Sequence, residues 1–300
     1  LNEPLKMIYY VLPEKQQGAD SFLIEAEEHL NFFAEKFGQY PWIEEKFGLV
    51  HTPYLGMEHQ TINAYGNNYK KTKRGYDFIL FHEAGHEWWG NYISVADWSD
   101  FWIHEGICTY AESMYIEEKF GLESAKNFID ERFKKNITNT APIVPDRNSN
   151  ANLESGNDVY YKGAHALHML RYIIGKETLW ASLKEYLQMP KELPDNQTST
   201  EEFISLIEEN SGMKLDWFFN QYFFKKELPT LRKLEKTIKN KKYVDLWWEE
   251  VDFKMPIEIN YFSFDGKRYK KLDLDNKPKR FVIPSESDLV IDPNRWLLYK

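Results

Sequence analysis

The sequence predicts an α+β protein, in which a mostly helical part with a small sheet precedes a small antiparallel β-sandwich. Apolar residues recur at helical spacing through most of the first 225 residues, whereas runs of strand length dominate after Pro229. Aromatic residues make up 16% of the chain, which is typical of a folded protein with a large core. We expect two domains, residues 1–225 and 226–300, with the boundary near Lys226.

The first 75 residues alternate between strands and one long helix. Phe22, Leu23, Ala26, Leu30 and Phe33 share one face of a helical pattern that ends at a glycine. A further strand leads into Ala64 and is followed by a polar loop through Gly75. The predicted elements are a strand at Leu5–Val11, a helix at Ser21–Phe37 and a strand at Phe47–Thr52.

The next 150 residues are predicted to be almost wholly helical. The main interruption is Asn136–Asp158, whose length and Asn- and Pro-rich composition predict a surface loop that borders a site. We expect Asp97 or Ser99 to cap the helix that follows them, and Ser199 to open another with a capping box. The predicted helices are about Tyr76–Asn91, Asp100–Phe120, Glu123–Lys135, Tyr160–Ile174, Glu177–Leu187, Ser199–Asn210 and Leu215–Phe224.

The last 75 residues consist of short runs rich in β-branched and aromatic side chains, separated by polar turns such as Lys239–Lys241. Short strands at regular spacing predict a small antiparallel sandwich. The predicted strands are Leu231–Ile238, Tyr243–Glu249, Met255–Phe262, Lys267–Leu274, Arg280–Ile283 and Leu289–Asp292.

Composition excludes several functions. The formal net charge of −9 argues against a nucleic-acid partner, which would require a basic surface. No apolar run has the length of a membrane span, and a single cysteine, Cys108, excludes an internal disulfide framework. The chain opens on Leu1 rather than Met, so we expect a processed chain or a fragment. A removed export signal would leave no trace, which leaves the compartment open.

The stretch from Phe81 to Asn91 contains His82-Glu83-x-x-His86. Two histidines four residues apart lie one turn apart on the same face of a helix and can hold one metal ion. The pattern alone also fits two ordinary histidines on an amphipathic helix. The surrounding residues are apolar nearly all round, which predicts a buried helix. Three buried ionisable groups are costly unless they are paired or bind a metal, so we favour a metal site.

A hydrolytic zinc site uses three protein ligands and keeps one position open for water. Glu105 is the best candidate for the third ligand. Eighteen residues separate it from His86, and it lies on the next predicted helix. The sequence therefore predicts one Zn²⁺ per chain, held by His82, His86 and Glu105, with Glu83 beside it and free to reach a water molecule.

These motifs resemble those of the gluzincin zinc aminopeptidases, the metallopeptidase family that includes aminopeptidase N and leukotriene hydrolase. The resemblance rests on three motifs in the family's order. They are Leu55-Gly56-Met57-Glu58-His59, then His82-Glu83-x-x-His86 with Glu105 inside Trp102-Ile103-His104-Glu105-Gly106, and then Tyr160-Tyr161-Lys162-Gly163. It implies a thermolysin-like catalytic domain over about Leu5–Phe224, followed by the sandwich. The family's N-terminal β domain and C-terminal helical domain have no counterpart in this sequence.

The resemblance also implies a role for each matched residue. Glu83 would be the general base, which takes a proton from the attacking water and passes it to the leaving amine. Tyr160 would donate its hydroxyl proton to the oxyanion. Glu58 would bind the free α-ammonium of a peptide substrate, and Gly56 and Met57 would offer an edge strand to its backbone. Without the motifs, Tyr160 would be interpreted as a structural tyrosine and Glu58 as an exposed loop carboxylate.

Two positions depart from the family pattern, which has Asn where this chain has His59 and His104. We hypothesise that the two positions are neighbours, so that a contact between two histidines replaces a polar contact between the two asparagines of the family. Glu112 lies two turns after Glu105 and is a candidate to orient a ligand histidine. The remaining residues that could carry chemistry belong to none of these motifs, and we interpret them as packing residues of the core: His51, His165, His168 and Cys108.

The sequence thus predicts a zinc aminopeptidase that acts on peptides with a free N-terminus. The first alternative is a zinc endopeptidase of the same class, which would apply if Glu58 did not face the substrate. The second is a peptide-binding module without catalysis, against which the intact Glu83 argues, because a structural metal site needs no general base. The motifs do not specify which N-terminal residue is preferred or the oligomeric state.

Overall fold

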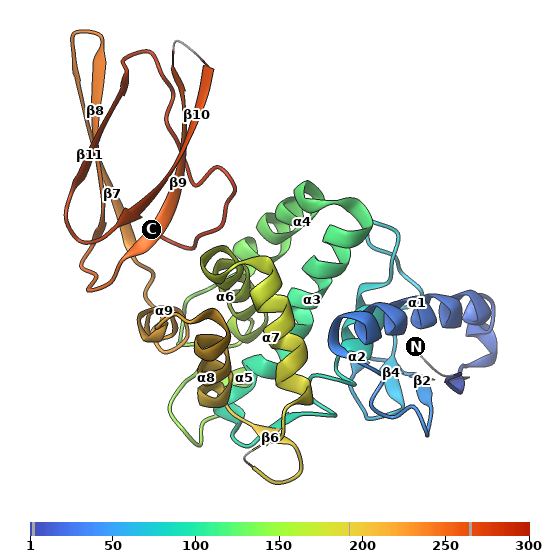
Figure 1. Cartoon of the computed structure of the whole chain (residues 1–300). Helices are drawn as coiled ribbons and strands as arrows, with labels where there is room; N and C mark the ends of the chain where they lie inside the picture. The colour runs from blue at the N-terminus through green and yellow to red at the C-terminus, as the bar shows by residue number, and fades with distance from the viewer. Residues whose placement is uncertain (2–3, 192, 264–265) are drawn as a thin grey trace.

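The computed structural model describes residues 1, 4–191, 193–263 and 266–300. The chain forms a sheet-containing N-terminal part, a central helical part and a β-sandwich that projects from the helices at the opposite end from the N-terminus (Figure 1). Among the described residues, no helix combines the length and apolarity needed to cross a membrane.

The N-terminal part is built on a four-stranded sheet in the order β1-β2-β4-β3. β1 pairs with β2 and β2 pairs with β4 in parallel, whereas β3 is antiparallel to β4 and forms one edge of the sheet. The predicted strands before residue 65 are therefore present, and Gly56–Met57 forms the edge strand that the family resemblance implies. The strands are β1 (Met7–Tyr10), β2 (Phe47–His51), β3 (Gly56–Met57) and β4 (Asn63–Tyr65).

Helix α1 (Ala19–Phe37) packs against the sheet part with the apolar face that its sequence predicts. Phe22, Ala26 and Leu30 are at most 1% exposed. The helix ends at Gly38, whose φ of 108° lies in the left-handed region that favours glycine. Its buried face contacts helix α2, and so the first helix supports the helix that carries the HExxH motif.

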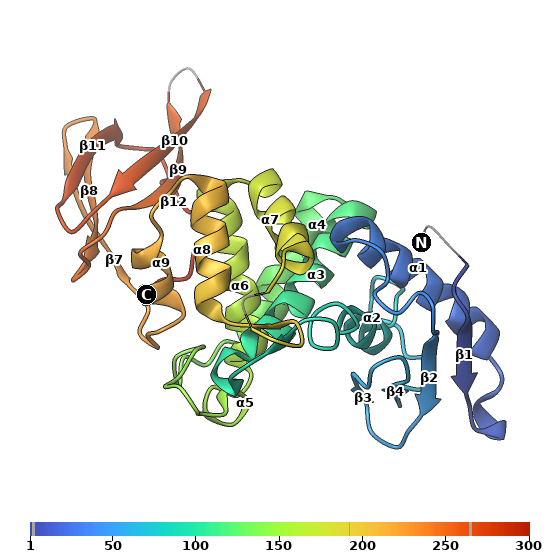
Figure 2. The ribbon, with the colours of Figure 1, turned by 60° about the horizontal axis from the view of Figure 1, so that its bottom comes forward.

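Helix α2 (Phe78–Gly85) lies between the small sheet and the helical part (Figure 2). The Asp77 carboxylate caps it by accepting hydrogen bonds from the backbone N–H groups of Ile79 and Leu80. The prediction that this helix runs from Tyr76 to Asn91 is wrong at its C-terminal end. The backbone tightens into three-residue turns after Ala84 and reaches a φ of 136° at Gly90, so His86 is the C-cap residue rather than an interior one.

Helices α3 and α6 form the centre of the helical part and touch through two glycines. A Cβ placed on Gly106 would lie 2.9 Å from the carbonyl oxygen of Val159 and 3.3 Å from the Cα of Gly163. Only residues without side chains permit this close approach. The helices of this part are α3 (Trp102–Phe120), α4 (Leu122–Phe128), α5 (Ala151–Glu154), α6 (Asp158–Ile174), α7 (Lys176–Gln188), α8 (Thr200–Ser211) and α9 (Asp216–Tyr222).

Three local features of this part differ from the sequence prediction. The predicted helix 123–135 is interrupted, because α4 passes into a π-helical turn (Ile129–Phe133) and a 3-10 turn (Lys134–Asn136). Asp97 caps the 3-10 turn Trp98–Asp100 and not α3, whose N-cap residue makes no side-chain bond. Two short strands, β5 (Ser94–Val95) and β6 (Gln197–Thr198), pair in parallel although their lengths gave no sequence signal.

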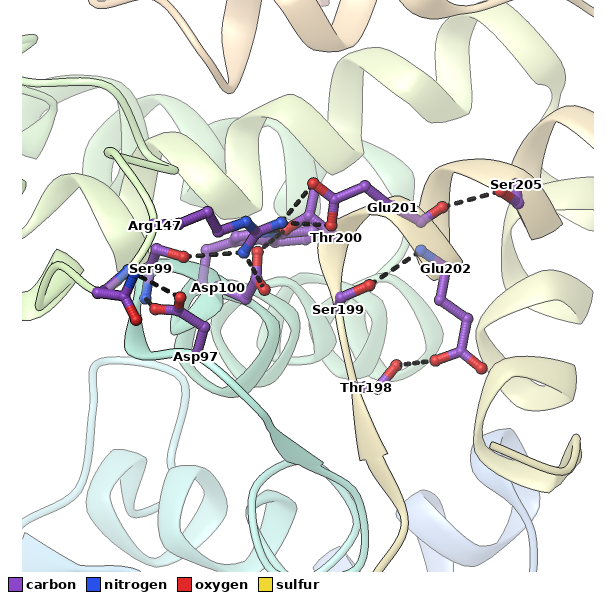
Figure 3. A network of polar contacts seen from close by, with 12 residues as sticks. Asp97, Ser99, Asp100, Arg147, Thr198, Ser199, Thr200, Glu201, Glu202 and Ser205 are labelled. Atoms are coloured by element: carbon purple, nitrogen blue, oxygen red, sulfur yellow. Dashed lines mark hydrogen bonds and ion pairs between the residues drawn. The ribbon is translucent and has the colours of Figure 1, made fainter. Parts of the chain in front are cut away.

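A polar network joins the predicted surface loop to the start of α3 (Figure 3). The Arg147 guanidinium donates to Ser99 Oγ at 2.8 Å and to the buried Asp100 carboxylate at 2.5 Å, and it also pairs with Glu201. Asp100 accepts a second bond from Thr200 Oγ1 at 2.6 Å. The network therefore ties the loop and α8 to the turn that leads into the Glu105 helix.

The β-sandwich consists of two three-stranded sheets, in the orders β10-β9-β12 and β11-β8-β7. All six predicted strands are present within two residues of their predicted bounds. Val244, Leu246, Ile257 and Ile259 are fully buried, as their alternation predicts. The strands are β7 (Thr230–Ile238), β8 (Lys241–Glu249), β9 (Met255–Ser263), β10 (Gly266–Leu274), β11 (Lys279–Pro284) and β12 (Val290–Ile291).

The last residues of the sandwich return to the helices. The Trp296 ring stacks on His168, with centroids 4.6 Å apart, and Arg295 pairs with Asp130 of the π-helical turn at 2.7 Å. Tyr222 of α9 donates its hydroxyl hydrogen to the carbonyl oxygen of Leu298 at 3.2 Å. A division into domains 1–225 and 226–300 stays a prediction.

Candidate active site

The three predicted metal ligands converge between α2 and α3. Nε2 of His82 lies 3.1 Å from Nε2 of His86 and 3.1 Å from Oε2 of Glu105, and Nε2 of His86 lies 3.3 Å from the same carboxylate oxygen. Each of the three residues is at most 8% exposed. Burial alone would raise the pKa of Glu105, but the rings of His86 and His82 hold it well below its ordinary value.

These separations match those in a tetrahedral metal site. Two ligand atoms that each lie about 2.0 Å from an ion are about 3.3 Å apart at the tetrahedral angle. The donor set, two imidazole nitrogens and one carboxylate oxygen, is the set that zinc accepts in hydrolases. His82, His86 and Glu105 therefore fit a divalent ion such as Zn²⁺.

The protein backbone orients one ligand ring. Nδ1 of His86 lies 2.8 Å from the carbonyl oxygen of Trp89. Since a carbonyl can only accept, Nδ1 is the protonated nitrogen in the neutral ring, and Nε2 presents its lone pair to the site. The Cys108 sulfur lies 3.5 Å from the same Nδ1, so this thiol contacts the site indirectly as well as packing. The sequence gave no signal for the Trp89 contact, because it is made by the main chain.

Glu83 lies beside the ligand set with part of its carboxylate unsatisfied. Its Oε2 atom is buried and has no hydrogen-bond partner among the described residues. Burial raises the pKa of Glu83 to about 7, while His82 and His86 act in the opposite direction. A carboxylate of this kind, next to a metal site and lacking a partner, is suited to accept a proton from water.

The edge strand β3 brings the predicted substrate-binding residues to the same place. Carboxylate oxygens of Glu58 and Glu83 and a ring nitrogen of His86 all lie within 4.8 Å of one another. Gly56 packs directly on the general-base candidate, since a Cβ built there would lie 2.4 Å from Glu83 Oε1. Met57 is 45% exposed on this edge. Glu58 is therefore not a remote loop carboxylate.

Tyr160 approaches from α6 on the other side. Its ring is 6.2 Å from the His82 ring in a stacked arrangement. Burial, with the nearby Glu105 carboxylate, raises the pKa of Tyr160, so its hydroxyl keeps its proton at neutral pH. Tyr161, the neighbouring tyrosine, contacts the Arg132 guanidinium, which lies 5.4 Å from its ring centroid.

The two histidines that depart from the family pattern are not partners. His104 is buried and turned away from the ligand set, where its Nε2 accepts a hydrogen bond from the backbone N–H of Val95 at 3.1 Å. His59 is exposed, and no contact joins the two rings among the described residues. The hypothesis that they exchange one polar contact is therefore not supported.

The remaining candidates have structural surroundings. Glu112 accepts a hydrogen bond from the Tyr76 hydroxyl, and no bond to a ligand histidine is formed within the described residues. His165 and His168 are buried, as predicted, with their pKa lowered by burial. His51 is only half-buried and bonds to Tyr9, with 3.3 Å between its Nδ1 and the hydroxyl oxygen, so its interpretation as a core residue is too strong.

A comparison with protein families decides the relationship of this chain. A model of the peptidase family M1 domain matches residues 23–222, which contain every site residue described above. The chain belongs to peptidase family M1. The resemblance to gluzincin aminopeptidases, noted from the motifs, is thereby confirmed.

Curated M1 relatives are distant and much longer. Endoplasmic reticulum aminopeptidase 1 of Mus musculus is 27% identical over 202 residues, which are 61% of this chain and 22% of that protein. Aminopeptidase M1-B of Oryza sativa subsp. japonica is 25% identical over 175 residues, 56% of this chain and 19% of the relative. The chain thus spans about a fifth of the length of these M1 proteins.

Solved structures share the fold of this chain, and one of them covers almost all of it. A Legionella pneumophila aminopeptidase A, solved with aspartic acid, matches 95% of this chain and 35% of its own with a TM-score of 0.76 at 19% identity. An M1 zinc metallopeptidase from Deinococcus radiodurans matches 68% of this chain and 44% of its own, with a TM-score of 0.57 at 22% identity. The predicted α+β fold with a following β part is confirmed.

Proposed function

We propose that this chain is a zinc-dependent aminopeptidase that hydrolyses the N-terminal peptide bond of peptides. The observation that carries the proposal is the meeting of three metal-donor atoms, 3.1–3.3 Å apart, with the carboxylates of Glu83 and Glu58 in a chain of family M1. M1 relatives are named aminopeptidases, and a solved neighbour is named a zinc metallopeptidase.

His82, His86 and Glu105 would hold the zinc. When bound, the ion supplies a Lewis acid that polarises the scissile carbonyl and acidifies water. Glu83 accepts the proton of the attacking water at its unpartnered Oε2 and delivers it to the leaving amine. A positioned general base of this kind contributes about 10²–10⁴-fold to the rate. Tyr160, protonated at neutral pH, donates a hydrogen bond to the oxygen that becomes negative in the transition state.

Glu58 sets the exopeptidase character. Its carboxylate pairs with the substrate's α-ammonium, and the Glu58, Glu83 and His86 donor atoms lie within 4.8 Å of one another, so the substrate's N-terminus is held close to the bond that is cut. The peptide backbone adds to the free edge of β3, where Gly56 and Met57 lie. Peptides with a free N-terminus are therefore the proposed substrates.

The two alternatives make different demands on the site. An endopeptidase needs space for the substrate chain to continue past Glu58, and the nearness of Glu58 to Glu83 disfavours this. A binding module without catalysis does not need a buried carboxylate with an unsatisfied oxygen, so the state of Glu83 favours an enzyme.

The experiment compares substrates with free and blocked N-termini. A panel of aminoacyl-arylamides is incubated with zinc-replete protein, alongside peptides of one sequence with and without N-acetylation. We expect cleavage of arylamides and of free peptides, with single residues released from the N-terminus. Glu58→Gln should raise KM and narrow the difference between free and acetylated peptides. Cleavage of only the acetylated peptide would identify an endopeptidase instead.

A further inference from the structure

We propose that a basic hollow beside the site binds a carboxylate on the leaving-group side of the substrate. This inference rests on the proposed aminopeptidase function and deepens it, because it names a substrate feature beyond the bond that is cut. The hollow has a volume of about 330 Å³. Its lining includes Leu55, Lys70, Lys71, Phe78, Ile79 and Arg132.

Arg132 is the principal cation of the hollow. Its guanidinium lies 4.6 Å from the Phe78 ring centroid and 5.4 Å from that of Tyr161, so two aromatic rings contact the cation. Among the described residues it forms no ion pair with any carboxylate. Its charge acts on the buried Glu112, whose pKa burial raises to about 7, but the two groups are not paired. The fork of Arg132 is thus available to a ligand.

The rest of the lining favours an anion. Lys70 adds a second positive charge, whereas Lys71 is already paired with Glu25. No lining residue in the described part of the chain is acidic. Arg132 and Lys70 therefore give the hollow a positive charge that no carboxylate in its described lining neutralises. The planar guanidinium of an arginine matches a carboxylate and binds it through two parallel hydrogen bonds.

The course of α2 places the hollow on the leaving-group side. The Glu58 carboxylate lies near Glu83 and His86, at the C-terminal end of α2. Phe78 and Ile79, which line the hollow, form the first turn of the same helix. Residues 79 and 86 are separated by seven positions, about 10 Å along a helix. The ligand histidine His82 lies between them. A substrate with its N-terminus at Glu58 therefore extends past the metal site towards the hollow.

The course of β3 gives the same direction. Leu55 directly precedes this strand and lines the hollow, whereas Glu58 directly follows the strand. A peptide paired antiparallel to it, with its N-terminus at Glu58, runs back towards Leu55. At about 3.4 Å per residue, the hollow lies one or two residues beyond the cut bond.

The bound carboxylate has two possible sources. It is either the C-terminal carboxylate of a di- or tripeptide or the side chain of an Asp or Glu that follows the N-terminal residue. Both present the same planar group to Arg132. Amidation of the C-terminus removes the terminal carboxylate but leaves a side-chain carboxylate intact, so it distinguishes the two sources.

The test uses two pairs of tripeptides that share the N-terminal residue best cleaved as an arylamide. One pair, X-Ala-Ala with a free or amidated C-terminus, tests the terminal carboxylate. The other pair, amidated X-Asp-Ala and X-Asn-Ala, tests the side chain. We expect kcat/KM to favour the carboxylate-bearing member of at least one pair by about tenfold, as for a hydrogen bond to a charged group. Arg132→Gln should abolish that preference, and Arg132→Lys should restore part of it.

Lys135→Gln is the matched control. Lys135 lies three residues after Arg132, but its side chain is exposed and outside the hollow, so the variant removes one positive charge without changing the proposed site. It should keep the preference. Absence of a preference in both pairs, or its persistence in Arg132→Gln, would overturn the inference. A second measurement does not depend on turnover: the affinities of Ala-Asp and of Ala-Asn amide are compared in wild type and in Arg132→Gln. Wild type should bind Ala-Asp more tightly than Ala-Asn amide, and Arg132→Gln should lose this difference. If arylamides are not cleaved but Ala-Asp binding still requires Arg132, the aminopeptidase function fails and the carboxylate site stands.

Discussion

Gly56 has no space for even a methyl group. Its backbone packs against the Glu83 carboxylate, and a Cβ would approach Glu83 Oε1 to 2.4 Å and Ile79 Cγ2 to 2.7 Å. The glycine therefore lets the edge strand lie directly over the general-base candidate. A peptide that pairs with this strand is brought close to Glu83 for the same reason.

Gly56→Ala should lower turnover without removing the metal. The new methyl group must displace the Glu83 carboxylate or the strand, and a misplacement of about 1 Å can reduce the rate roughly 100-fold. Steady-state kinetics on an arylamide measure the effect, and zinc content with thermal unfolding provides the control. Wild-type kcat in the alanine variant would show that Gly56 does not determine where Glu83 lies.

At this scale the residues that the sequence selected come together in the structure, because they lie in short motifs whose spacing reflects helix geometry. His82 and His86 are one turn apart in any helix, and Glu105 is reached by the next one. The sequence could not indicate the Trp89 carbonyl or the aromatic rings around Arg132. These contacts depend on tertiary packing between segments that share no motif.

The elements that carry the site are set by one close helix crossing. Glu105 lies on α3 and Tyr160 on α6, and the two helices meet where Gly106 faces Gly163. Gly106 directly follows Glu105, and Gly163 lies three residues after Tyr160. The distance between the helices therefore fixes the distance from the metal site to the proposed oxyanion donor.

Gly106→Ala should separate α3 from α6. The added Cβ would lie 2.9 Å from a backbone carbonyl, which cannot move without its helix. We expect a loss of about 1–3 kcal/mol in the free energy of unfolding, typical of overpacking, together with a fall in kcat. Chemical denaturation and arylamide kinetics measure the two effects. Unchanged stability and unchanged kcat would mean that the crossing tolerates a side chain.

The sequence predicted most elements but not where irregular ones begin. Helices with a clear apolar face, such as α1, and alternating strands, such as β8, were found close to their bounds. The early end of α2 and the π-helical turn after α4 were missed. Both depend on backbone bonds that the apolar pattern does not encode. β5 and β6 are two residues long, too short for a periodic signal.

At the scale of the whole molecule, two buried histidines of the described residues, His29 and His165, lack hydrogen-bond partners at both ring nitrogens. His29 is fully buried, and neither of its ring nitrogens has a hydrogen-bond partner in the described part of the chain. It packs among the rings of Tyr76, Phe81 and Tyr115, and the nearest carboxylate, Glu25, is 3.9 Å away. Burial lowers the pKa of His29 to about 3.

Stability should therefore fall as the pH falls below about 6.5. Between pH 6.5 and pH 3, His29 binds a proton in the unfolded chain but not in the folded one, which favours unfolding. The neutral His29 therefore lowers the stability of the fold by nothing above pH 6.5 and by increasing amounts as the pH falls towards 3. Between pH 7 and pH 5 one such histidine accounts for about 2 kcal/mol. His29→Phe should flatten the pH dependence by that amount in urea unfolding, whereas the exposed His59→Gln should not. Identical slopes for wild type and His29→Phe would refute the assignment.

The central claim is that zinc held by His82, His86 and Glu105 works together with Glu83 as its base. It is tested most directly by Glu83→Gln, with zinc content and arylamide turnover measured on the same sample. We expect one zinc per chain in both proteins and a kcat about 10²–10⁴-fold lower in the variant. Undiminished turnover in Glu83→Gln, or a wild-type protein that is active without stoichiometric metal, would contradict it.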